Sequence, residues 1–321
     1  MSGAPMSGRR RAVGAIGACF LAGRVAAMAE DRVYRIGVLC DEQVPYFWQQ
    51  LGALGYEDHR NVEYLQRGVD ASADPDRYAT RLVGARPNVI VACSNDLAAA
   101  AKRATTEIPI VLLYGVAPVE VGLVQSLARP GGNLTGSAAI TVEMAGKSLE
   151  LFKSAIPGLR RAVALLRTGD AVGRILHAGT QRMAGALGVS LTTIEVRDAG
   201  ELSSAFDRLG RERPDGVIVS SSLGPLAYDV VGLAATQRIP TMYPFAPRVR
   251  EGGLMAYAPN WIPQSENNAR IVHRILQGEK PRDIPMQQPV EYFFGINLKT
   301  ARALGLTIPR DVLLRATRIV E

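Results

Sequence analysis

The fold is decided by residues 86–114, which read RPNVIVACSNDLAAAAKRATTEIPIVLLY. A largely apolar run at 87–92 predicts a buried strand, and a second run at 108–113 predicts another. Between them, Ser94-Asn95-Asp96 opens an alanine-rich segment that favours a helix over 97–106. Strands without polar alternation that are separated by helices indicate a parallel sheet covered on both faces.

The same alternation continues on both sides of this stretch. Further strands are predicted at 34–40, 61–66 and 162–166, and a helix at 76–84. The glycine-rich residues 127–136 predict a turn and a hinge strand where one α/β unit passes to the next. The helix that follows is expected to begin near Thr141, whose hydroxyl can cap it.

The chain contains an internal similarity. Residues 213–243 repeat the order found at 86–114: Arg-Pro, an apolar strand, a serine-containing turn, a helix, Ile-Pro, a strand and a tyrosine. The offset of about 127 to 131 residues predicts two related α/β lobes. Chance similarity between two ordinary strand–helix units is the alternative interpretation.

Residues 1–29 have the layout of a secretory signal peptide. Arg9, Arg10 and Arg11 precede an apolar run at 12–23, and Ala27-Met28-Ala29 supplies small residues for cleavage. The run is shorter than the about 20 residues that a membrane-spanning helix needs. We therefore expect a mature chain that starts near Glu30 and works in the periplasm. A disordered tail or a buried helix, and a lipid anchor at Cys19, are the alternatives.

Length and charge limit the function classes. A chain of 321 residues allows about two domains. The net charge of +7 arises largely from four arginines within residues 1–29; the rest holds 33 basic and 30 acidic side chains. No basic stripe is left, so a nucleic-acid partner is not expected. Three scattered cysteines and three scattered histidines exclude a zinc-finger array.

Sequence motifs for catalysis are missing. No Gly-x-Gly-x-x-Gly follows the first strand, and no Gly-x-Ser-x-Gly occurs. Gly146-Lys147-Ser148 resembles the end of a phosphate-binding loop, but Thr141 stands where that loop needs its first glycine. His59, His177 and His273 lack metal-ligand spacing. We expect no cofactor, no metal and no enzymatic activity.

The candidate binding residues lie where strands end, because ligands of open α/β sheets bind at the carboxyl ends of the strands. Ser94 and Asn95 follow one predicted strand, and Ser221 and Ser222 follow its counterpart. At either place the side chains can contact an anionic ligand or simply cap a helix. The aromatic side chains at strand ends can hold an organic ligand or pack as core; they are Tyr114, Tyr243, Phe245 and Tyr257.

Cys40 and Cys93 each end a predicted strand. Their strands are neighbours in a doubly wound sheet, so the two side chains are expected to lie close together. Adjacent parallel strands seldom offer disulfide geometry. We therefore expect two buried free thiols, with an oxidised pair as the alternative in an exported protein.

Residues 297–309, NLKTARALGLTIP, resemble the C-terminal signature of the ABC-transporter substrate-binding proteins related to the tryptophan/tyrosine-binding type. Residues 127–136, 252–257 and 275–281 are similar to other marks of that family. The resemblance covers roughly residues 33 to 321. It implies a two-lobed periplasmic-binding-protein fold of type I, each lobe a parallel sheet flanked by helices, with three crossovers between the lobes. The implied lobes are residues 30–140 plus 259–321 and residues 141–258.

The resemblance also implies a site between the lobes. Its positions are Asp41, Ser94, Asn95, Tyr114 and Gly115 in the first lobe, and Thr168, Ser221, Ser222, Tyr243 and Tyr257 in the second. Ala117 and Ser222-Leu223-Gly224 stand where relatives often carry carboxylates, which weakens the case for gripping an ammonium group.

The function implied is that of an extracytoplasmic receptor. It would bind a small amino-acid-like, aromatic or carboxylate ligand and deliver it to the membrane permease of an ABC importer. The alternative is a sensory binding protein on the same fold that signals to a membrane receptor.

Overall fold

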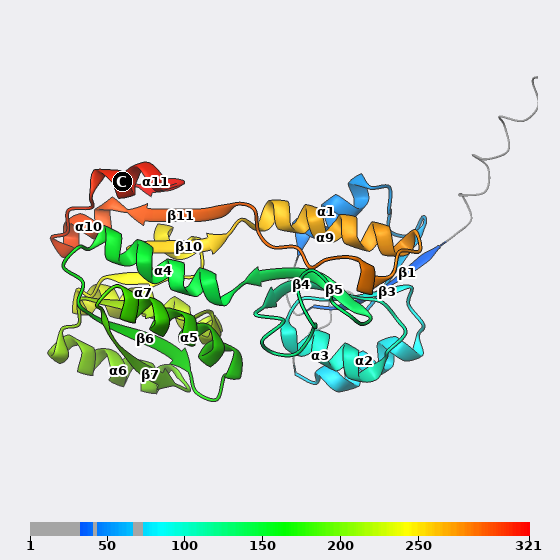
Figure 1. The fold of residues 1–321 in the computed structure, drawn as a ribbon, viewed down its shortest axis with the longest axis horizontal. Helices are drawn as coiled ribbons and strands as arrows, with labels where there is room; N and C mark the ends of the chain where they lie inside the picture. Colours follow the sequence, from blue (N-terminus) through cyan, green and yellow to red (C-terminus); the bar gives the residue numbers. More distant parts are fainter. Residues whose placement is uncertain (1–32, 41–43, 67–72) are drawn as a thin grey trace, which may run out of the picture.

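The computed structural model describes residues 33–40, 44–66 and 73–321. The predicted signal peptide, residues 1–29, lies outside these ranges. Within them, no helix combines the length and the apolar character needed to cross a membrane. The chain forms two α/β lobes that lie side by side along its longest axis (Figure 1), which confirms the predicted two-lobed fold.

The first lobe contains a five-stranded sheet in the order β2-β1-β3-β4-β5, and all its strand pairs are parallel. Its strands are β1 (Tyr34–Leu39), β2 (Val62–Leu65), β3 (Val89–Ala92), β4 (Ile110–Val116) and β5 (Leu134–Ile140). Its helices are α1 (Pro45–Ala53), α2 (Pro75–Gly84), α3 (Asn95–Ala104), α9 (Trp261–Leu276) and the 3-10 turn η2 (Pro281–Asp283). Ile36 and Val38 pack with α1 and α9, whereas Leu39 packs with α2 and α3, so helices cover both faces.

The second lobe contains a seven-stranded sheet in the order β12-β11-β10-β9-β8-β6-β7. Only the β10–β11 pair is antiparallel among these described strands. The strands are β6 (Arg161–Arg167), β7 (Ser190–Val196), β8 (Gly216–Val219), β9 (Thr241–Tyr243), β10 (Met255–Pro259), β11 (Tyr292–Asn297) and β12 (Arg318–Val320). The helices are α4 (Val142–Ala155), α5 (Ala171–Ala186), α6 (Ala199–Glu212), α7 (Ala227–Gln237), α8 (Pro247–Arg250), α10 (Leu298–Leu304), α11 (Arg310–Arg315) and the 3-10 turn η1 (Ser221–Leu226).

The core of the second lobe is also two-sided. Leu149 and Phe152 of α4 pack with Met242 and Ile296 on one face of the sheet, and residues of α10 and α11 join them. Residues of α6 and α7 pack with Val217 and their neighbours on the other face. The sheet is therefore buried on both faces, as an apolar parallel sheet requires.

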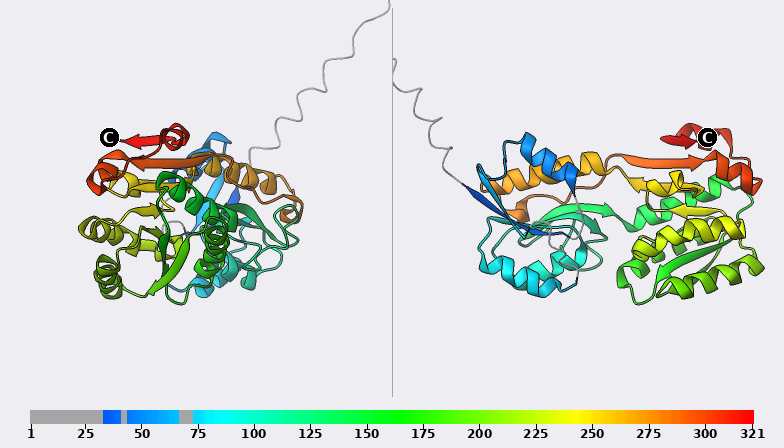
Figure 2. Two further views of the ribbon diagram at one scale, coloured as in Figure 1. Left: turned by 60° about the vertical axis from the view of Figure 1, so that its left-hand side comes forward. Right: turned by 180° about the vertical axis from the view of Figure 1, so that it is seen from behind.

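Three segments, here called passages one to three, join the lobes. Passage one runs from β5 into α4 at Thr141, passage two from β10 into α9 at Asn260, and passage three through 288–291 into β11. Figure 2 shows the joined lobes from two further sides. The passages correct the expected lobe boundaries, which placed all of 259–321 in the first lobe. Strands β11 and β12 pair with β10 instead, because their apolar residues complete the core of the second lobe.

The two lobes repeat the same local structure. Arg86 and Arg213 both adopt left-handed backbone, with φ of 50° and 47°. The Pro109 carbonyl accepts the Ile90 N–H and the Pro240 carbonyl accepts the Val217 N–H, each at 2.8 Å. Equivalent turns and hydrogen bonds at these offsets confirm that the internal similarity marks two related halves.

Short polar side chains fix where the helices begin. Thr141 caps α4 as predicted, its hydroxyl accepting the Met144 N–H at 3.3 Å. Ser94 caps α3 in the same way, and Asp170 caps α5. At Gly136, with φ of +131°, a Cβ would lie 2.1 Å from the Leu112 carbonyl oxygen. Only glycine allows β5 to approach β4 this closely beside passage one.

Candidate functional site

The carboxyl ends of both sheets face the junction between the lobes. Strand β5 leaves the first lobe through passage one, and β4, β3 and β1 run parallel to it. Strand β10 leaves the second lobe through passage two, and β9, β8 and β6 run parallel to it. The loops that follow these strands therefore lie at the junction of the lobes, here called the cleft, which is the end of each sheet where ligands of open α/β sheets bind.

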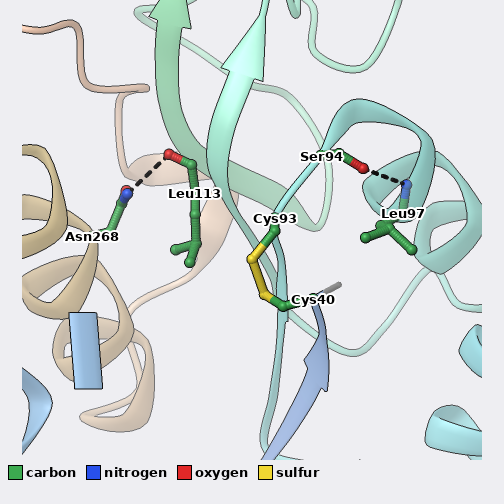
Figure 3. Close-up of a disulfide and its surroundings, with 6 residues drawn as sticks. All are labelled: Cys40, Cys93, Ser94, Leu97, Leu113 and Asn268. Carbon is green, nitrogen blue, oxygen red and sulfur yellow. Dashed lines mark hydrogen bonds between the residues drawn. A yellow bond between two sulfur atoms is a disulfide. The ribbon is translucent and has the colours of Figure 1, made fainter. Parts of the chain in front are cut away.

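Ser94 and Asn95 follow β3 in the first lobe, and both side chains form hydrogen bonds with the backbone. The Ser94 hydroxyl accepts the Leu97 N–H at 3.4 Å (Figure 3), which is the capping interpretation of this residue. The Asn95 amide donates to the Val116 carbonyl at 2.7 Å and accepts the Val116 N–H at 3.0 Å. Asn95 therefore pins the loop after β4 to the start of α3.

A disulfide lies beside these residues and corrects the expectation of two free thiols. Cys40 and Cys93 are bonded, with their Cα atoms 5.0 Å apart, within the range that disulfides need (Figure 3). Leu39 and Ala92 are the last paired residues of β1 and β3, so both cysteines lie just beyond the regular sheet. The Cys93 N–H still donates to the Leu39 carbonyl at 3.0 Å, which holds the two strand ends side by side. The candidate Asp41 follows Cys40 and lies outside the described residues.

Tyr114 and Gly115 lie at the carboxyl end of β4. The Tyr114 ring makes an edge-to-face contact with Trp261, with ring centroids 4.9 Å apart. Trp261 is the first residue of α9, directly after passage two, so this aromatic pair lines the junction of the lobes. A Cβ on Gly115 would lie 2.3 Å from the Ser137 carbonyl oxygen, so the glycine serves the close packing of β4 on β5.

Thr168, Ser221 and Ser222 lie at the cleft end of the second lobe. Thr168 is exposed after β6, and its N–H donates to the Val196 carbonyl at 3.0 Å. The Ser222 hydroxyl accepts the Arg167 N–H at 3.1 Å, so it joins the loops after β8 and β6. Ser221 is half-buried and lines a cavity described below.

Tyr243, which was expected to close over the ligand, has a buried side chain, and the residue forms part of the wall of a cavity described below. Its side chain is 1 % exposed and packs in the core against α6 and α7. Gly253 makes room for it, because a Cβ there would lie 2.5 Å from the ring. Burial raises the pKa of the Tyr243 hydroxyl to about 12. That hydroxyl finds no hydrogen-bond partner among the residues that the structure describes.

Tyr257 lies at the lobe junction. Its ring stacks on Tyr292 with centroids 5.1 Å apart and planes 17° apart, which joins β10 to the start of β11. Desolvation by burial raises the pKa of Tyr257 to about 12, and Tyr292 and Glu150 act in the same direction. The two rings belong to an apolar cluster that also holds Ala117 and Ile140 of the first lobe.

A cavity of about 50 Å³ lies in the second lobe, between the sheet and helices α4 and α5, and Ile140 of β5 also lines it. Ser220, Ser221 and Pro244 lie at its cleft end, where β8 and β9 finish. Its wall is mainly apolar and includes Met144, Ala145, Ala164, Leu166, Leu176, Ile218 and Met242. Such a wall suits an apolar group rather than a charge.

His177 supplies a polar group to this cavity. Its ring nitrogen Nε2 lies 2.7 Å from the Thr193 hydroxyl. Desolvation by burial lowers the pKa of His177, against the opposing effect of Glu195. The imidazole is therefore held towards its neutral form, and the cavity gains no fixed charge from it.

The chain is similar in sequence to a known family of proteins. Residues 40–320 match the sequence profile of the ABC transporter substrate binding proteins. The chain belongs to this family. The tyrosine-binding protein of Clostridioides difficile (strain R20291) is 26 % identical to this substrate-binding protein over 268 residues, which cover 81 % of this chain and 75 % of that protein. The resemblance read from the sequence is thereby confirmed, as is the function of a substrate-binding protein that takes a small ligand.

Solved structures with the same fold include an ABC domain bound to L-Trp and a ligand-free substrate-binding protein. The ABC domain from Streptococcus pneumonia in complex with L-Trp matches with a TM-score of 0.80 at 22 % identity, covering 90 % of this chain and 100 % of that chain. The ligand-free, open structure of a substrate-binding protein with adhesive properties from Clostridium difficile matches with a TM-score of 0.70 at 22 % identity, covering 90 % and 99 %. At this identity the similarity shows the fold.

Sequence reasoning missed the wall of the cavity. Met144 and Ser148 lie four residues apart on α4, and Gly173, His177 and Thr180 follow helical spacing on α5. This spacing places each set on one helix face. Helix α5 was not among the predicted elements, so these side chains were not predicted to lie together.

Proposed function

We propose that this substrate-binding protein works in the periplasm, where it closes its two lobes on a small organic solute and presents that solute unchanged to the permease of an ABC importer. Its family membership and the signal-peptide layout of residues 1–29 support this assignment. Among the described residues, no group of three or more His, Cys, Asp or Glu side chains is placed to hold a metal ion.

The observation that carries the proposal is the cavity in the second lobe. Almost all of its wall comes from α4, α5, β6, β8 and β9, which belong to that lobe. Its size therefore depends little on how far the lobes are open. One water-sized group needs roughly 10–15 Å³ of such volume, so the cavity of about 50 Å³ holds about three to five of them, the size of a short aliphatic group.

These dimensions favour a ligand with a short apolar end. Helices α3, α4 and α5 direct their N-termini to the cleft, and helix N-termini favour a negative group. The relatives named above bind tyrosine or contain L-Trp, which makes an amino acid a natural first class to test. We propose an amino-acid-like carboxylate whose apolar part is smaller than an indole ring.

A thermal-shift screen tests this function, since a ligand of the native state raises the melting temperature by mass action. The panel holds glycine, L-alanine, L-valine, L-leucine, L-tyrosine, L-tryptophan, butyrate and benzoate. We expect stabilisation by a member with a short aliphatic end, confirmed by calorimetry. A panel without any stabilising compound would contradict the proposed ligand class.

Filling the cavity tests its role in binding. Ala145→Leu adds three carbons to a half-buried wall residue of α4. We expect it to weaken binding of the L-valine-sized ligand at least tenfold, about 1.4 kcal/mol. Ala99→Leu, at a half-buried position of α3 away from the cavity, is the matched control. Equal affinities in both variants would exclude the cavity from the site.

A further inference from the structure

Ser137 contacts segments that border the passages between the lobes. It stands in β5, four residues before Thr141 of passage one. Its backbone pairs with Gln287, and the Ala138 N–H donates to the Gln287 carbonyl at 2.8 Å, which holds the chain that leads into passage three. Its side chain contacts α9, which begins directly after passage two. Ser137 thus contacts, or belongs to, the elements that lead into or follow all three passages.

The side-chain contacts form a continuous hydrogen-bonded network. The Ser137 hydroxyl donates to Asn268 Oδ1 at 2.6 Å and accepts a hydrogen bond from Gln264 Nε2. Asn268 Nδ2 donates in turn to the Leu113 carbonyl at 3.0 Å (Figure 3). Leu113 precedes Tyr114, the aromatic residue at the cleft end of β4. The network therefore links β5, which leads into passage one, through α9 to β4, whose carboxyl end carries Tyr114.

These polar groups occupy core positions. Ser137 and Asn268 are 0 % exposed and Gln264 is 1 % exposed. Burying polar side chains is costly unless they are hydrogen-bonded, and a satisfied network specifies one geometry more narrowly than apolar packing does. Apolar residues at these places on α9 would fill the space without fixing how the helix sits on β5.

Passage two is hydrogen-bonded to passage three. The Asn260 N–H donates to the Glu291 carbonyl at 3.0 Å, and Asn260 Nδ2 donates to Glu291 Oε2 at 3.0 Å. Passages two and three are thus both attached to the start of α9, through Asn260. Any tilt of α9 on β5 moves the second lobe, because its β10 and β11 are attached to these same residues.

We propose that Ser137, Gln264 and Asn268 are positioning residues for lobe closure. They hold α9 and β5 as one frame in the first lobe, so that bending is confined to the residues that leave the frame: Thr141, Asn260 and 288–291. Without the network α9 rocks on β5, and the two halves of the binding site meet in many orientations instead of one.

Hydrogen exchange of the ligand-free protein tests this role without knowledge of the ligand. Ser137→Ala removes the shared hydroxyl and leaves two buried partners unpaired. We expect amide exchange at 138–142 and 259–264 to become about tenfold faster, the change in an opening equilibrium that corresponds to 1.4 kcal/mol. Small-angle scattering should show a broader range of lobe separations.

Thr135→Val is the matched control. Thr135 lies two residues away on the same strand, is also 0 % exposed, and donates to the Ile284 carbonyl at 2.7 Å, outside the network. We expect it to lower the melting temperature while leaving exchange at 259–264 unchanged. Ser137→Thr, which keeps the hydroxyl, should restore the wild-type exchange pattern.

The proposal is overturned if Ser137→Ala and Thr135→Val alter exchange and scattering alike, because the network would then contribute stability only. Should Ser137→Ala fail to fold, Gln264→Met removes one hydrogen bond at similar side-chain length, and the same comparison decides. These measurements need no ligand, so a failed ligand screen leaves them unaffected.

Discussion

Reducing the Cys40–Cys93 disulfide should cost this protein a large part of its stability. The bond joins residues 53 apart in the sequence. The chain-entropy relation assigns a loop of this length about 4 kcal/mol, because the bond restricts the unfolded chain. At an unfolding entropy of roughly 2.1 cal/mol/K per residue, a mature chain of about 290 residues loses about 1.6 °C per kcal/mol, so a melting temperature about 6–7 °C lower is expected.

The measurement is a denaturant titration of the mature protein with and without reductant, together with the Cys40→Ser, Cys93→Ser double variant. Reduced wild type and double variant should lose similar free energies of unfolding, since both lack the same constraint. Thiol titration of the unfolded, unreduced mature protein should find no free thiol. The bond also fixes the ends of β1 and β3 beside Ser94, so ligand affinity should fall in both reduced and variant protein.

Two results would refute this reasoning. Two free thiols in the unreduced protein would restore the expectation drawn from parallel-strand geometry. A double variant within about 0.5 kcal/mol of wild type, the range of an ordinary surface substitution, would mean that the bond constrains little.

Further outcomes are expected elsewhere in the chain. Asn95→Ala should lower the free energy of unfolding of the ligand-free protein by about 1–3 kcal/mol, because it leaves the N–H and the carbonyl of Val116 without their partner. Ser94→Ala should lower it by about 1 kcal/mol, because a helix cap is lost. Equal melting temperatures of the two variants would contradict this. Tyr243→Phe should be neutral or stabilising, because it removes an unpaired buried hydroxyl. The pKa of Tyr243 is about 12 in the folded protein and about 10 in the unfolded chain, so the free energy of unfolding is unaffected by this group below pH 10. As the pH rises from 10 to 12, the unfolded chain loses the phenol proton first, and the free energy of unfolding falls by roughly 2–3 kcal/mol. The stability of wild type relative to Tyr243→Phe should fall over that interval, and parallel pH profiles would contradict the assignment. Mass spectrometry of the periplasmic protein should find a chain that starts near Glu30, and an intact N-terminus would contradict export by cleavage.

The sequence by itself determined the architecture. Apolar strands bounded by turn residues specify a parallel sheet, because such strands are stable only when both faces are buried. The Arg-Pro and Ile-Pro pairs at matching offsets specified two related halves, and the left-handed Arg86 and Arg213 show the shared backbone behind that pattern. Thr141 was identifiable as a cap because capping depends on residues within a single turn.

The tertiary structure alone decided how these parts meet. Ser94, Asn95 and Ser222 lie at the predicted strand ends, but contacts with Val116 and Arg167, distant in sequence, determine what their side chains do. Tyr243 stands at a strand end like Tyr114, yet the absence of a side chain at Gly253 buries it.

The passages between the lobes, the cavity and the disulfide also depend on contacts between residues distant in the sequence. Strand β11 joins the second sheet, Ser137 contacts α9 across 131 positions, and Cys40 bonds Cys93 across 53. Local composition encodes helices, strands and caps because their hydrogen bonds close within a few residues. The candidate site lies between segments far apart in the sequence, so its geometry depends on how those segments pack in the folded chain.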